Sequence, residues 1–378
     1  MLMKKIIAVL ISLAVFHNSE GQIIRFNGQA AGWLTGNVST VPGFQAGVRY
    51  IPELSLNVPV NDKYSIEGEL SADGAASYTM QKDSAGTAQA DARLYRFWLR
   101  LSGERFEVRA GLQKINFGSA SMLRPLMWFD RIDPRDPLGL TTGVYGLLGK
   151  YYFKNNANIW IWGLIGNGDP KGWEIIPSET GRPEFGGRLQ LPVPRGEFAI
   201  TYNNREAEFP RTWQPPVTGS RYFPEHRFGL DFKVDLGVGL WMESSVTWQK
   251  QNEIPPYTGA MTLGADYTFN IMEGLHVTAE HMFMNSSENL LSSGEKISFS
   301  GISLSLPLSI ITRVSAIFFY DWKNDGFYRF ANLSLTYDKF GINFIGFWNP
   351  DNFEIFNYNT GANMFAGYGG QIMIVYNH

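Results

Sequence analysis

Apolar and polar residues alternate along the chain, from just after residue 22 to its end, in segments of about ten residues. The segment 105–113 shows this most plainly: one face would carry Phe106, Val108, Ala110 and Leu112, and the other Arg105, Glu107, Arg109 and Gln113. Side chains of a β-strand point alternately to its two faces, so this segment has one apolar face and one charged face. The connections between segments are alternately very short and long. This pattern is typical of a transmembrane β-barrel, whose outer face meets lipid and whose inner face meets water.

The first residues predict export from the cytoplasm. Lys4 and Lys5 precede an apolar run over 6–16, and Ser19 and Gly21 then place small residues before a cleavage point at Gln22. This is the pattern of a secretory signal peptide, expected over residues 1–21. A membrane anchor is the less favoured alternative, because the run has about 11 residues and an anchor needs roughly 20. No cysteine follows the run, which excludes a lipid-anchored lipoprotein.

The composition narrows the class of protein further. Aromatic residues make up 15% of the chain and glycines number 40, whereas charged residues make up only 18% and the mean hydropathy is −0.15. A helical membrane protein would be far more apolar than this chain. A transmembrane barrel can have this composition, because half of the residues of each strand are polar. The chain has no cysteine, so disulfides and thiolate metal sites are excluded. A net charge of −3 gives no general attraction to nucleic acid.

The pattern predicts an all-β, transmembrane, antiparallel up-and-down barrel of about 16–18 strands. Residues 22–378 would form this one domain, since no linker or charge block marks a second one. Short periplasmic turns would alternate with long external loops, and an even number of strands returns the C-terminus to the periplasmic side. The long loops are expected at 77–91, 116–141, 167–183, 205–225, 287–295 and 350–363.

The alternation also assigns the two faces of neighbouring strands. Outward positions would carry Tyr64, Ile66, Leu70, Tyr95, Phe97, Leu99 and Leu101. Inward positions would place Glu67 and Glu69 beside Arg96 and Arg100, with Arg105, Glu107 and Arg109 on the next strand. The opposite assignment is unfavourable, because each arginine facing lipid at mid-membrane costs roughly 2–4 kcal/mol. We therefore expect a ladder of paired charges along the inner wall.

The long segment 116–141 is unusually apolar for an external loop. It nevertheless carries the charged residues Arg124, Asp130, Arg131, Asp133, Arg135 and Asp136. An apolar loop of this length would not extend freely into water. We expect it to fold back into the mouth of the barrel and narrow it. The alternative is a packed external cap with no part in transport.

The sequence from Arg109 to Gly118, followed by Asp130, Ile132-Asp133 and Asp136-Pro137, resembles bacterial outer-membrane porin-type barrels. The most similar groups are the alginate-export and phosphate-selective porins, in which such a strand leads into an inward-folding loop. The resemblance covers about 30 residues. It implies a channel with an arginine-lined lumen for anionic solutes. The chain departs from the pattern at its end, where Tyr376 lies two places before the last residue instead of an aromatic residue at the terminus.

Catalytic chemistry finds little support in the sequence. The stretch from His276 to His281 has the wrong spacing for a zinc signature, and strand alternation would turn the two histidines to opposite faces. No serine has the context of a nucleophile. The pairs Asp130/Asp133 and Asp133/Asp136 could act as general acid and base, but each carboxylate has an arginine nearby in sequence. Ordinary charge pairing is favoured, so we predict neither an enzyme nor a metal or cofactor.

The favoured hypothesis is a passive outer-membrane channel for small hydrophilic solutes, with a weak preference for anions at most. A barrel of this size leaves an aqueous channel, whereas one of about eight strands is filled by side chains. The predicted pore-lining residues are Arg96, Arg100, Arg105, Arg109, Arg124, Arg131, Arg135, Glu67, Glu69, Glu107, Asp130, Asp133 and Asp136. The expected partners are outer-membrane lipid, the solute and the barrel-assembly machinery, with a homo-oligomer left open.

Two other hypotheses remain open from the sequence. A barrel plugged by its loops could act as a structural or assembly partner in the outer membrane. A hydrolase at the rim of the barrel is a weaker third hypothesis, because it needs a carboxylate pair that the arginines do not neutralise.

Overall fold

The computed structural model describes residues 23–38, 43–82, 85–214, 216–217, 219–251, 253–289, 294–351 and 364–378. The expected signal peptide at 1–21 lies outside the described residues. The described chain forms 18 strands. Their bounds are β1 Ile23–Asn37, β2 Gly43–Asn61, β3 Tyr64–Gln81, β4 Thr87–Ser102, β5 Phe106–Gln113, β6 Val144–Tyr152, β7 Asn158–Leu164, β8 Glu184–Val193, β9 Gly196–Glu208, β10 Tyr222–Asp235, β11 Gly239–Gln249, β12 Tyr257–Phe269, β13 Leu275–Ser287, β14 Glu295–Pro307, β15 Thr312–Asp321, β16 Gly326–Tyr337, β17 Phe340–Trp348 and β18 Tyr368–Asn377.

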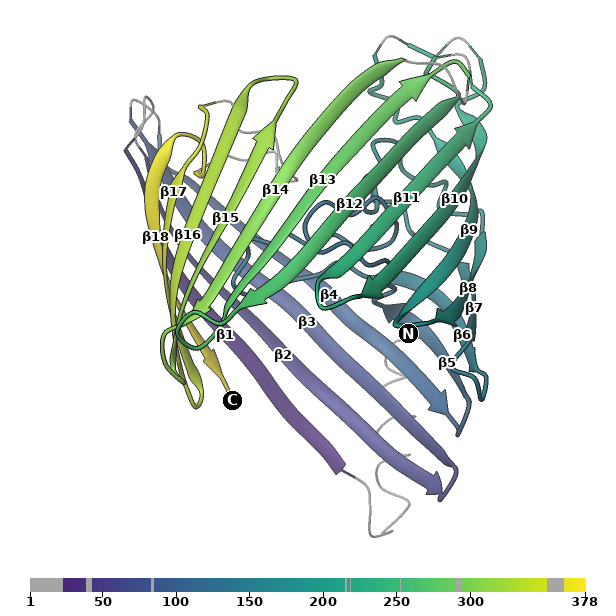
Figure 1. The fold of residues 1–378 in the computed structure, drawn as a ribbon, viewed down its shortest axis with the longest axis horizontal. Coiled ribbons are helices and arrows are strands. Elements are labelled where there is room, and N and C mark those ends of the chain that lie inside the picture. The colour runs from purple at the N-terminus through teal and green to yellow at the C-terminus, as the bar shows by residue number, and fades with distance from the viewer. Residues whose placement is uncertain are drawn as a thin grey trace.

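The strands form one closed, antiparallel, up-and-down barrel (Figure 1). Each strand pairs with the next one in the chain, and β18 pairs with β1 to close the sheet. Closure leaves no strand edge without a hydrogen-bonded partner, as a membrane demands. The predicted fold is confirmed, and the strand number is the higher of the two expected values. Among the described residues, no helix is long and apolar enough to cross a membrane.

Short turns and long connections lie at opposite ends of the barrel. The strand pairs β2–β3, β4–β5 and β10–β11 are joined by a few residues at the end of the barrel where β1 begins and β18 ends. Gly237, in the β10–β11 turn, has a φ of 90°, and its N–H donates to Oδ1 of Asp235. Such a φ favours glycine, because a Cβ would be strained there. The long connections β5–β6 and β7–β8 lie at the other end.

The outer surface of the barrel is apolar. On β3 and β4, Ile66, Leu70, Leu99 and Leu101 are exposed, and Leu99 keeps 49% of its surface accessible. A water-soluble protein would bury such residues, whereas lipid covers them in a membrane. Tyr95 is an exception to the expected outward face. It lies at a β-bulge between β3 and β4, and its hydroxyl accepts a hydrogen bond from the Thr141 N–H. It therefore contacts the β5–β6 connection instead of facing lipid.

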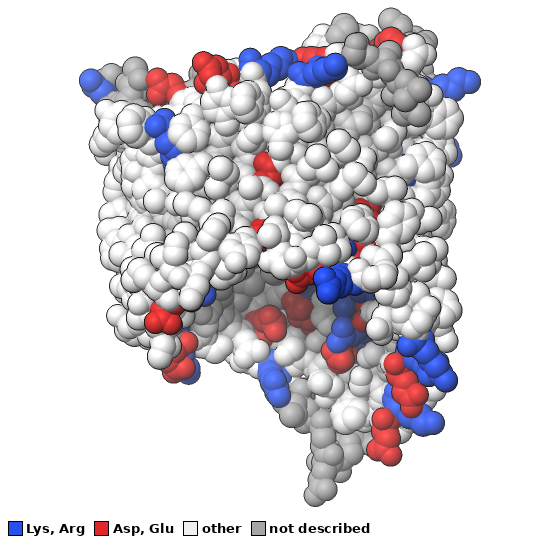
Figure 2. All heavy atoms as spheres, in the orientation of Figure 1, with Lys and Arg blue, Asp and Glu red and all other residues white. Residues whose placement is uncertain are grey.

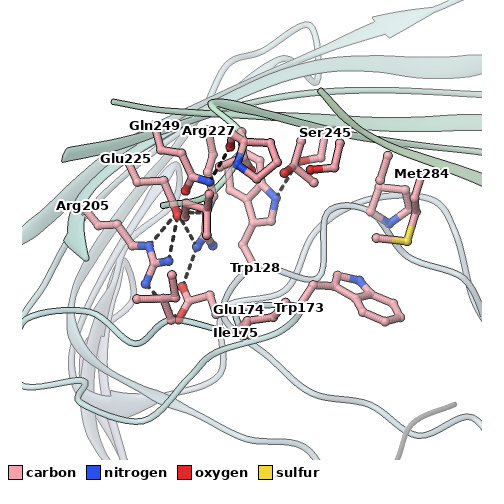
Figure 3. A pocket seen from close by; sticks show the side chains of 18 of the residues that line it. Trp128, Trp173, Glu174, Ile175, Arg205, Glu225, Arg227, Ser245, Gln249 and Met284 are labelled. Carbon is pink, nitrogen blue, oxygen red and sulfur yellow. Dashed lines mark hydrogen bonds and ion pairs between the residues drawn. The ribbon is translucent and has the colours of Figure 1, made fainter. Parts of the chain in front are cut away.

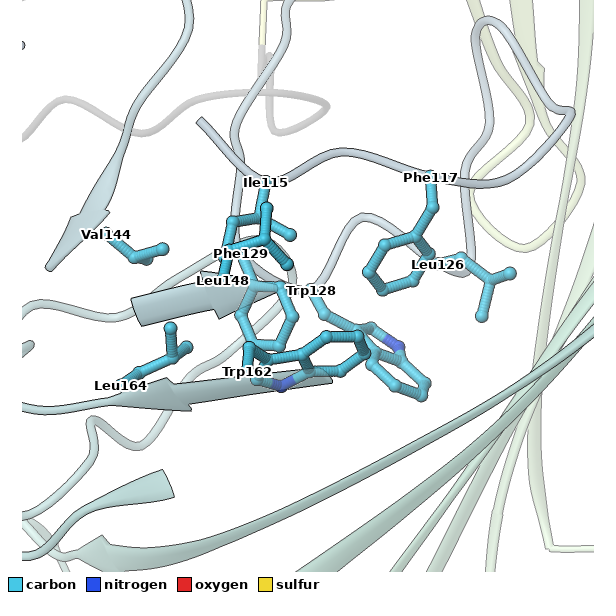
Figure 4. Packing of buried hydrophobic residues seen from close by; sticks show 9 residues of the cluster. All are labelled: Ile115, Phe117, Leu126, Trp128, Phe129, Val144, Leu148, Trp162 and Leu164. Atoms are coloured by element: carbon cyan, nitrogen blue, oxygen red, sulfur yellow. The ribbon is translucent and has the colours of Figure 1, made fainter. Parts of the chain in front are cut away.

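The main apolar core lies inside the barrel, where the β5–β6 connection packs against the wall. Phe117 and Phe129 from this connection contact Trp162 of β7, with ring centroids 5.8 and 5.4 Å apart, and Trp128 packs on both phenylalanines at 5.6 and 6.4 Å (Figure 4). Ile115, Leu126, Val144, Leu148 and Leu164 complete this cluster. A second buried cluster joins Met122 and Leu123 to inward-facing residues of β13 and β15–β17, namely Met282, Phe319, Tyr328, Phe330 and Phe347. The connection is thus packed against two different parts of the wall.

Candidate functional site

The interior of the barrel is the candidate site, and the β5–β6 connection organises it. We call residues 114–143, between β5 and β6, the inner loop. Its middle part makes hydrogen bonds to side chains of β11, β12 and β13. These strands are six to eight places from β5 in the circular order of 18 strands, so they belong to a different side of the wall. The inner loop therefore reaches across the lumen from the strands that carry it.

Glu280 of β13 fixes the middle of the inner loop through backbone hydrogen bonds. Its carboxylate accepts from the N–H groups of Ser121 at 2.6 Å, Met122 at 2.9 Å and Leu123 at 2.6 Å. The Ser121 hydroxyl and Nε1 of Trp241 donate to the same carboxylate at 3.1 and 3.2 Å. One buried carboxylate thus satisfies three consecutive backbone donors that have no strand partner. Hydrogen bonds to a charged group are roughly twice as strong as neutral ones.

Glu243 of β11 holds the flanking residues in the same way. It accepts from the N–H of Ala120 at 2.9 Å and of Leu126 at 2.6 Å. Between these two carboxylates, Thr262 of β12 donates its hydroxyl hydrogen to the Leu123 carbonyl at 2.7 Å. Trp128 donates through Nε1 to the hydroxyl of Ser245 at 3.1 Å. Three adjacent strands therefore bind one stretch of the inner loop through their inward-facing polar side chains.

Arg96 of β4 fixes the returning end of the inner loop. Its guanidinium donates to the hydroxyl of Thr141 at 2.5 Å and to the Thr141 carbonyl at 3.3 Å. It also donates to the carbonyl of the preceding residue, Tyr95, at 2.6 Å. Its side chain is buried. Arg96 was predicted to line the pore, and the structure shows it holding the inner loop in place.

The predicted charges of the inner loop are mostly engaged within it. Arg124 is buried and donates to Asn116 and to the Phe117 carbonyl, so it supports the loop's own backbone and does not border open water. Asp130 is also buried, with Nζ of Lys114 3.7 Å away. Both residues were expected to be exposed to the pore, but the apolar packing of the loop buries them.

The remaining charges of the loop are half-buried and hydrogen-bonded. Asp133 accepts from Arg135 at 2.5 Å, and the Arg135 guanidinium lies 4.9 Å from the ring centre of Phe330. Asp136 accepts from the N–H groups of Leu138 and Leu140, at 3.0 and 3.2 Å. Arg131 donates through Nε to the Gly172 carbonyl at 3.2 Å. Asp133 thus has a charge partner, and Asp136 stabilises a turn.

The charge ladder expected on the inner wall is formed on β3–β6. Arg100 is ion-paired with Glu67 of β3 and lies 3.5 Å from Glu107 of β5. Lys150 of β6 extends the ladder with an ion pair of 2.9 Å to Glu107. Arg109 stacks over Trp98, 4.7 Å from its ring centre. These side chains are half-buried, so they border the part of the interior that the inner loop leaves free.

Two other predicted residues lie beside this ladder. Glu69 accepts from Nε1 of Trp98 at 3.1 Å and from the Ser71 hydroxyl at 3.0 Å. Arg105 is half-buried just before β5, and its carbonyl accepts from the Tyr152 N–H. The space-filling view is hollowed below the lower ends of the strands nearest the viewer, and acidic and basic side chains lie in the hollow (Figure 2). Charged side chains are therefore visible in a hollow near the short-turn end of the barrel.

A second buried charge cluster was missed by the sequence reasoning. Glu174, in the β7–β8 connection, is 1% exposed and is ion-paired with Lys171, Arg205 and Arg227 at 2.8–3.3 Å. Glu225 of β10 binds both arginines at 2.6 Å, and Glu184 of β8 binds Lys171 at 2.8 Å. Three positive and three negative groups thus neutralise one another. The sequence signal that could have revealed this cluster is the period-two alternation of the strands, which turns Arg205, Glu225 and Arg227 toward the interior.

Removing the charge of Asp130 should stabilise the barrel by about 1–3 kcal/mol at neutral pH, because the carboxylate is buried and its ion-pair partner, Nζ of Lys114, is 3.7 Å away. Burial raises the pKa of Asp130 above its usual value, despite the opposing effects of Lys114, Arg124 and Arg96. A raised pKa in the folded state means that stability is highest at low pH and falls as the pH rises through that pKa. Asp130→Asn should abolish this fall, as urea unfolding between pH 4 and 7 would measure. Equal pH dependence in both proteins would contradict the assignment.

The described residues contain no group of three acidic or histidine side chains placed to hold a metal ion. His281 shares a hydrogen bond with the Ser300 hydroxyl through Nδ1, at 2.8 Å, and His276 lies near Thr268 and Thr278. The two histidines are thus engaged separately.

Comparisons with known proteins give matches in structure. No family model matches the chain, and a search of curated proteins gives no match. The fold is similar to that of OccK7 (OpdD) from Pseudomonas aeruginosa, with a TM-score of 0.56 and 8% identity over 95% of this chain and 99% of that one. It is also similar to an anion-selective porin from Comamonas acidovorans, with a TM-score of 0.53 and 12% identity over 94% and 100% of the two chains. At these identities the likeness concerns the fold. The chain is a closed, 18-stranded antiparallel transmembrane β-barrel of the kind that outer-membrane porins have.

Proposed function

We propose that the protein is a passive channel of the bacterial outer membrane for small hydrophilic solutes. The observation that carries this proposal is the division of the interior. The inner loop is bound to β11–β13, while the half-buried charge ladder of β3–β6 borders the space left free. A barrel of this strand number is wide enough to hold both a folded loop and an aqueous path. Its selectivity would come from the width beside the loop and from the charges along the ladder.

The wall supports a weak preference for anions at most. Arg100, Arg109 and Lys150 supply positive charge, but Glu67 and Glu107 lie within ion-pair distance of two of them. Outer-membrane lipid and the barrel-assembly machinery are the partners that this proposal implies. The proposal is compatible with either a monomer or a homo-oligomer.

The conductance of the purified barrel in a planar bilayer under a salt gradient tests this proposal. Discrete, ohmic current steps are the expected result, and the reversal potential gives the charge preference in the same recording. A barrel that is folded, as shown by its heat-modifiable migration on a gel, but never conducts would refute the channel.

Replacing Arg100 and Arg109 with glutamate should change the ratio of anion to cation permeability by about twofold or more toward cations. The two side chains lie in the half-buried ladder, where a reversed charge acts directly on a passing ion. Arg96 is unsuitable for this test because it holds Thr141. The control replaces Arg182 and Arg211, which are exposed in the β7–β8 and β9–β10 connections, and makes the same total change in charge. An unchanged reversal potential would show that the ladder does not line the path.

One observation favours a plugged barrel as the second candidate function. The β7–β8 connection packs on the inner loop: Trp173 donates through Nε1 to the Arg124 carbonyl at 2.7 Å, and Arg131 donates to Gly172. Two long connections thus occupy the interior together. A folded barrel without conductance that retains a co-purifying protein would support a structural or assembly role.

A further inference from the structure

A pocket of about 300 Å³ lies in the barrel interior, between the inner loop and strands β9–β13 (Figure 3). The inner loop and the β7–β8 connection form one wall, and inward-facing residues of β9–β13 form the other. Its apolar lining includes three tryptophans and two methionines: Trp128, Trp173, Trp213, Met282 and Met284. An apolar pocket is unexpected in a lumen that serves only hydrophilic solutes, because contact between apolar side chains and water is unfavourable.

Two of the tryptophans that line the pocket have engaged indole N–H groups. Nε1 of Trp128 donates to Ser245, and Nε1 of Trp173 donates to the Arg124 carbonyl. Both side chains are labelled in Figure 3, with Met284 beside Trp173. Aromatic rings and thioether groups make favourable contacts with a flat aromatic molecule. Because both indole N–H groups are engaged, neither is offered to a hydroxyl-rich molecule.

The other end of the pocket is charged but electrically balanced. Arg205, Glu225, Arg227 and Glu174 gather there, two positive and two negative, and are bonded to one another at 2.6–3.2 Å. An anion entering this end would meet as much negative as positive charge. Among the described residues, the hydrogen bonds of Arg227 use Nε and Nη2, so Nη1 can still donate to an oxygen atom. The preferred group at this end is therefore an uncharged oxygen.

We propose that this pocket binds a small, neutral aromatic molecule that carries one oxygen function. The ring would lie among Trp128, Trp173 and Met284, and the oxygen would accept from Arg227. The volume is sufficient, since an apolar cavity of about 150 Å³ holds benzene and ligand pockets begin near 300 Å³. The inference goes beyond the proposed channel function, because it concerns equilibrium binding and a class of solute that is not hydrophilic.

Titration calorimetry of the full barrel in detergent micelles with benzyl alcohol tests the proposal, after subtraction of the heat of partition into micelles alone. One saturable site is expected. Benzoate should bind about tenfold or more weakly, because its charge must be removed from water without a net positive partner. Glucose should give no binding heat. Tighter binding of benzoate or of glucose than of benzyl alcohol would overturn the proposed class of ligand.

Two matched variants locate the site. Met284→Glu places a charge in the apolar wall of the pocket and should weaken benzyl alcohol binding about tenfold or more. Ser303→Glu places the same charge on the inward face of β14, outside the pocket lining, and should leave the affinity unchanged. Equal affinity in both variants would show that the molecule binds elsewhere and would refute the proposal. A barrel that conducts but does not bind refutes only this inference, and a barrel that binds but does not conduct refutes only the channel.

Discussion

Replacing Glu280 with alanine should raise the single-channel conductance by about twofold or more, because the inner loop loses its central attachment. The substitution leaves the N–H groups of Ser121, Met122 and Leu123 without their acceptor. Each buried donor left unsatisfied costs about 1–3 kcal/mol, so the loop is expected to move to a position where water can reach these groups. Movement away from β13 widens or redirects the path. Planar-bilayer recordings of the wild type and the variant measure the change.

Two controls separate loop release from a simple change of charge. Glu280→Gln keeps one acceptor oxygen and should give an intermediate conductance. Glu53→Ala removes the same charge from the inward face of β2, where no inner-loop residue is bonded to it, and should leave the conductance near that of the wild type. A folded Glu280→Ala barrel that conducts like the wild type would show that Glu243 and the apolar packing hold the loop without Glu280.

Replacing Glu174 with alanine should lower the free energy of unfolding by about 3–5 kcal/mol, since it leaves buried cations without their partner. Arg205, Arg227 and Lys171 all contact this carboxylate, which is 1% exposed. The same substitution removes the contacts of this residue with β9 and β10, while the backbone hydrogen bonds of Pro177 and Glu179 to β9 remain. Unfolding in urea, followed by the loss of heat-modifiable migration, measures the effect. The matched control is Glu179→Ala in the same connection, where the carboxylate caps Gly181 and has no ion pair among the described residues.

The contribution of Glu174 should also depend on pH. Burial by itself would raise the pKa of this carboxyl, but Arg205, Lys171 and Arg227 outweigh it and hold the pKa below its usual value of 4.5. A lowered pKa in the folded state gives stability that is present above pH 4.5 and is lost as the pH falls through the lowered value. The wild type should therefore lose stability in acid more steeply than Glu174→Ala. Parallel curves for the two proteins would contradict the charged state of Glu174.

The barrel and the orientation of its wall follow from the alternation of residues along the chain. Leu99 faces outward and Arg100 inward because side chains alternate along a strand, and only one of the two parities keeps arginine out of lipid. This information is local, so it can be counted along the chain without knowing any contact between distant residues. The ion pair of Arg100 with Glu67 follows from the same parity on neighbouring strands.

The tertiary structure alone decided how the interior is filled. Glu280 lies 157–159 residues from the donors that it binds, and no pattern within the inner loop names its acceptor. The contact exists because barrel closure fixes which strand stands opposite β5, and that depends on all 18 strands together. Arg124 and Asp130 were expected at the pore, but the apolar residues around them pack against the wall and carry them into the loop's interior. The charges of these two side chains could be read from the sequence. Their burial and their bonding partners depend on where the closed barrel places the inner loop.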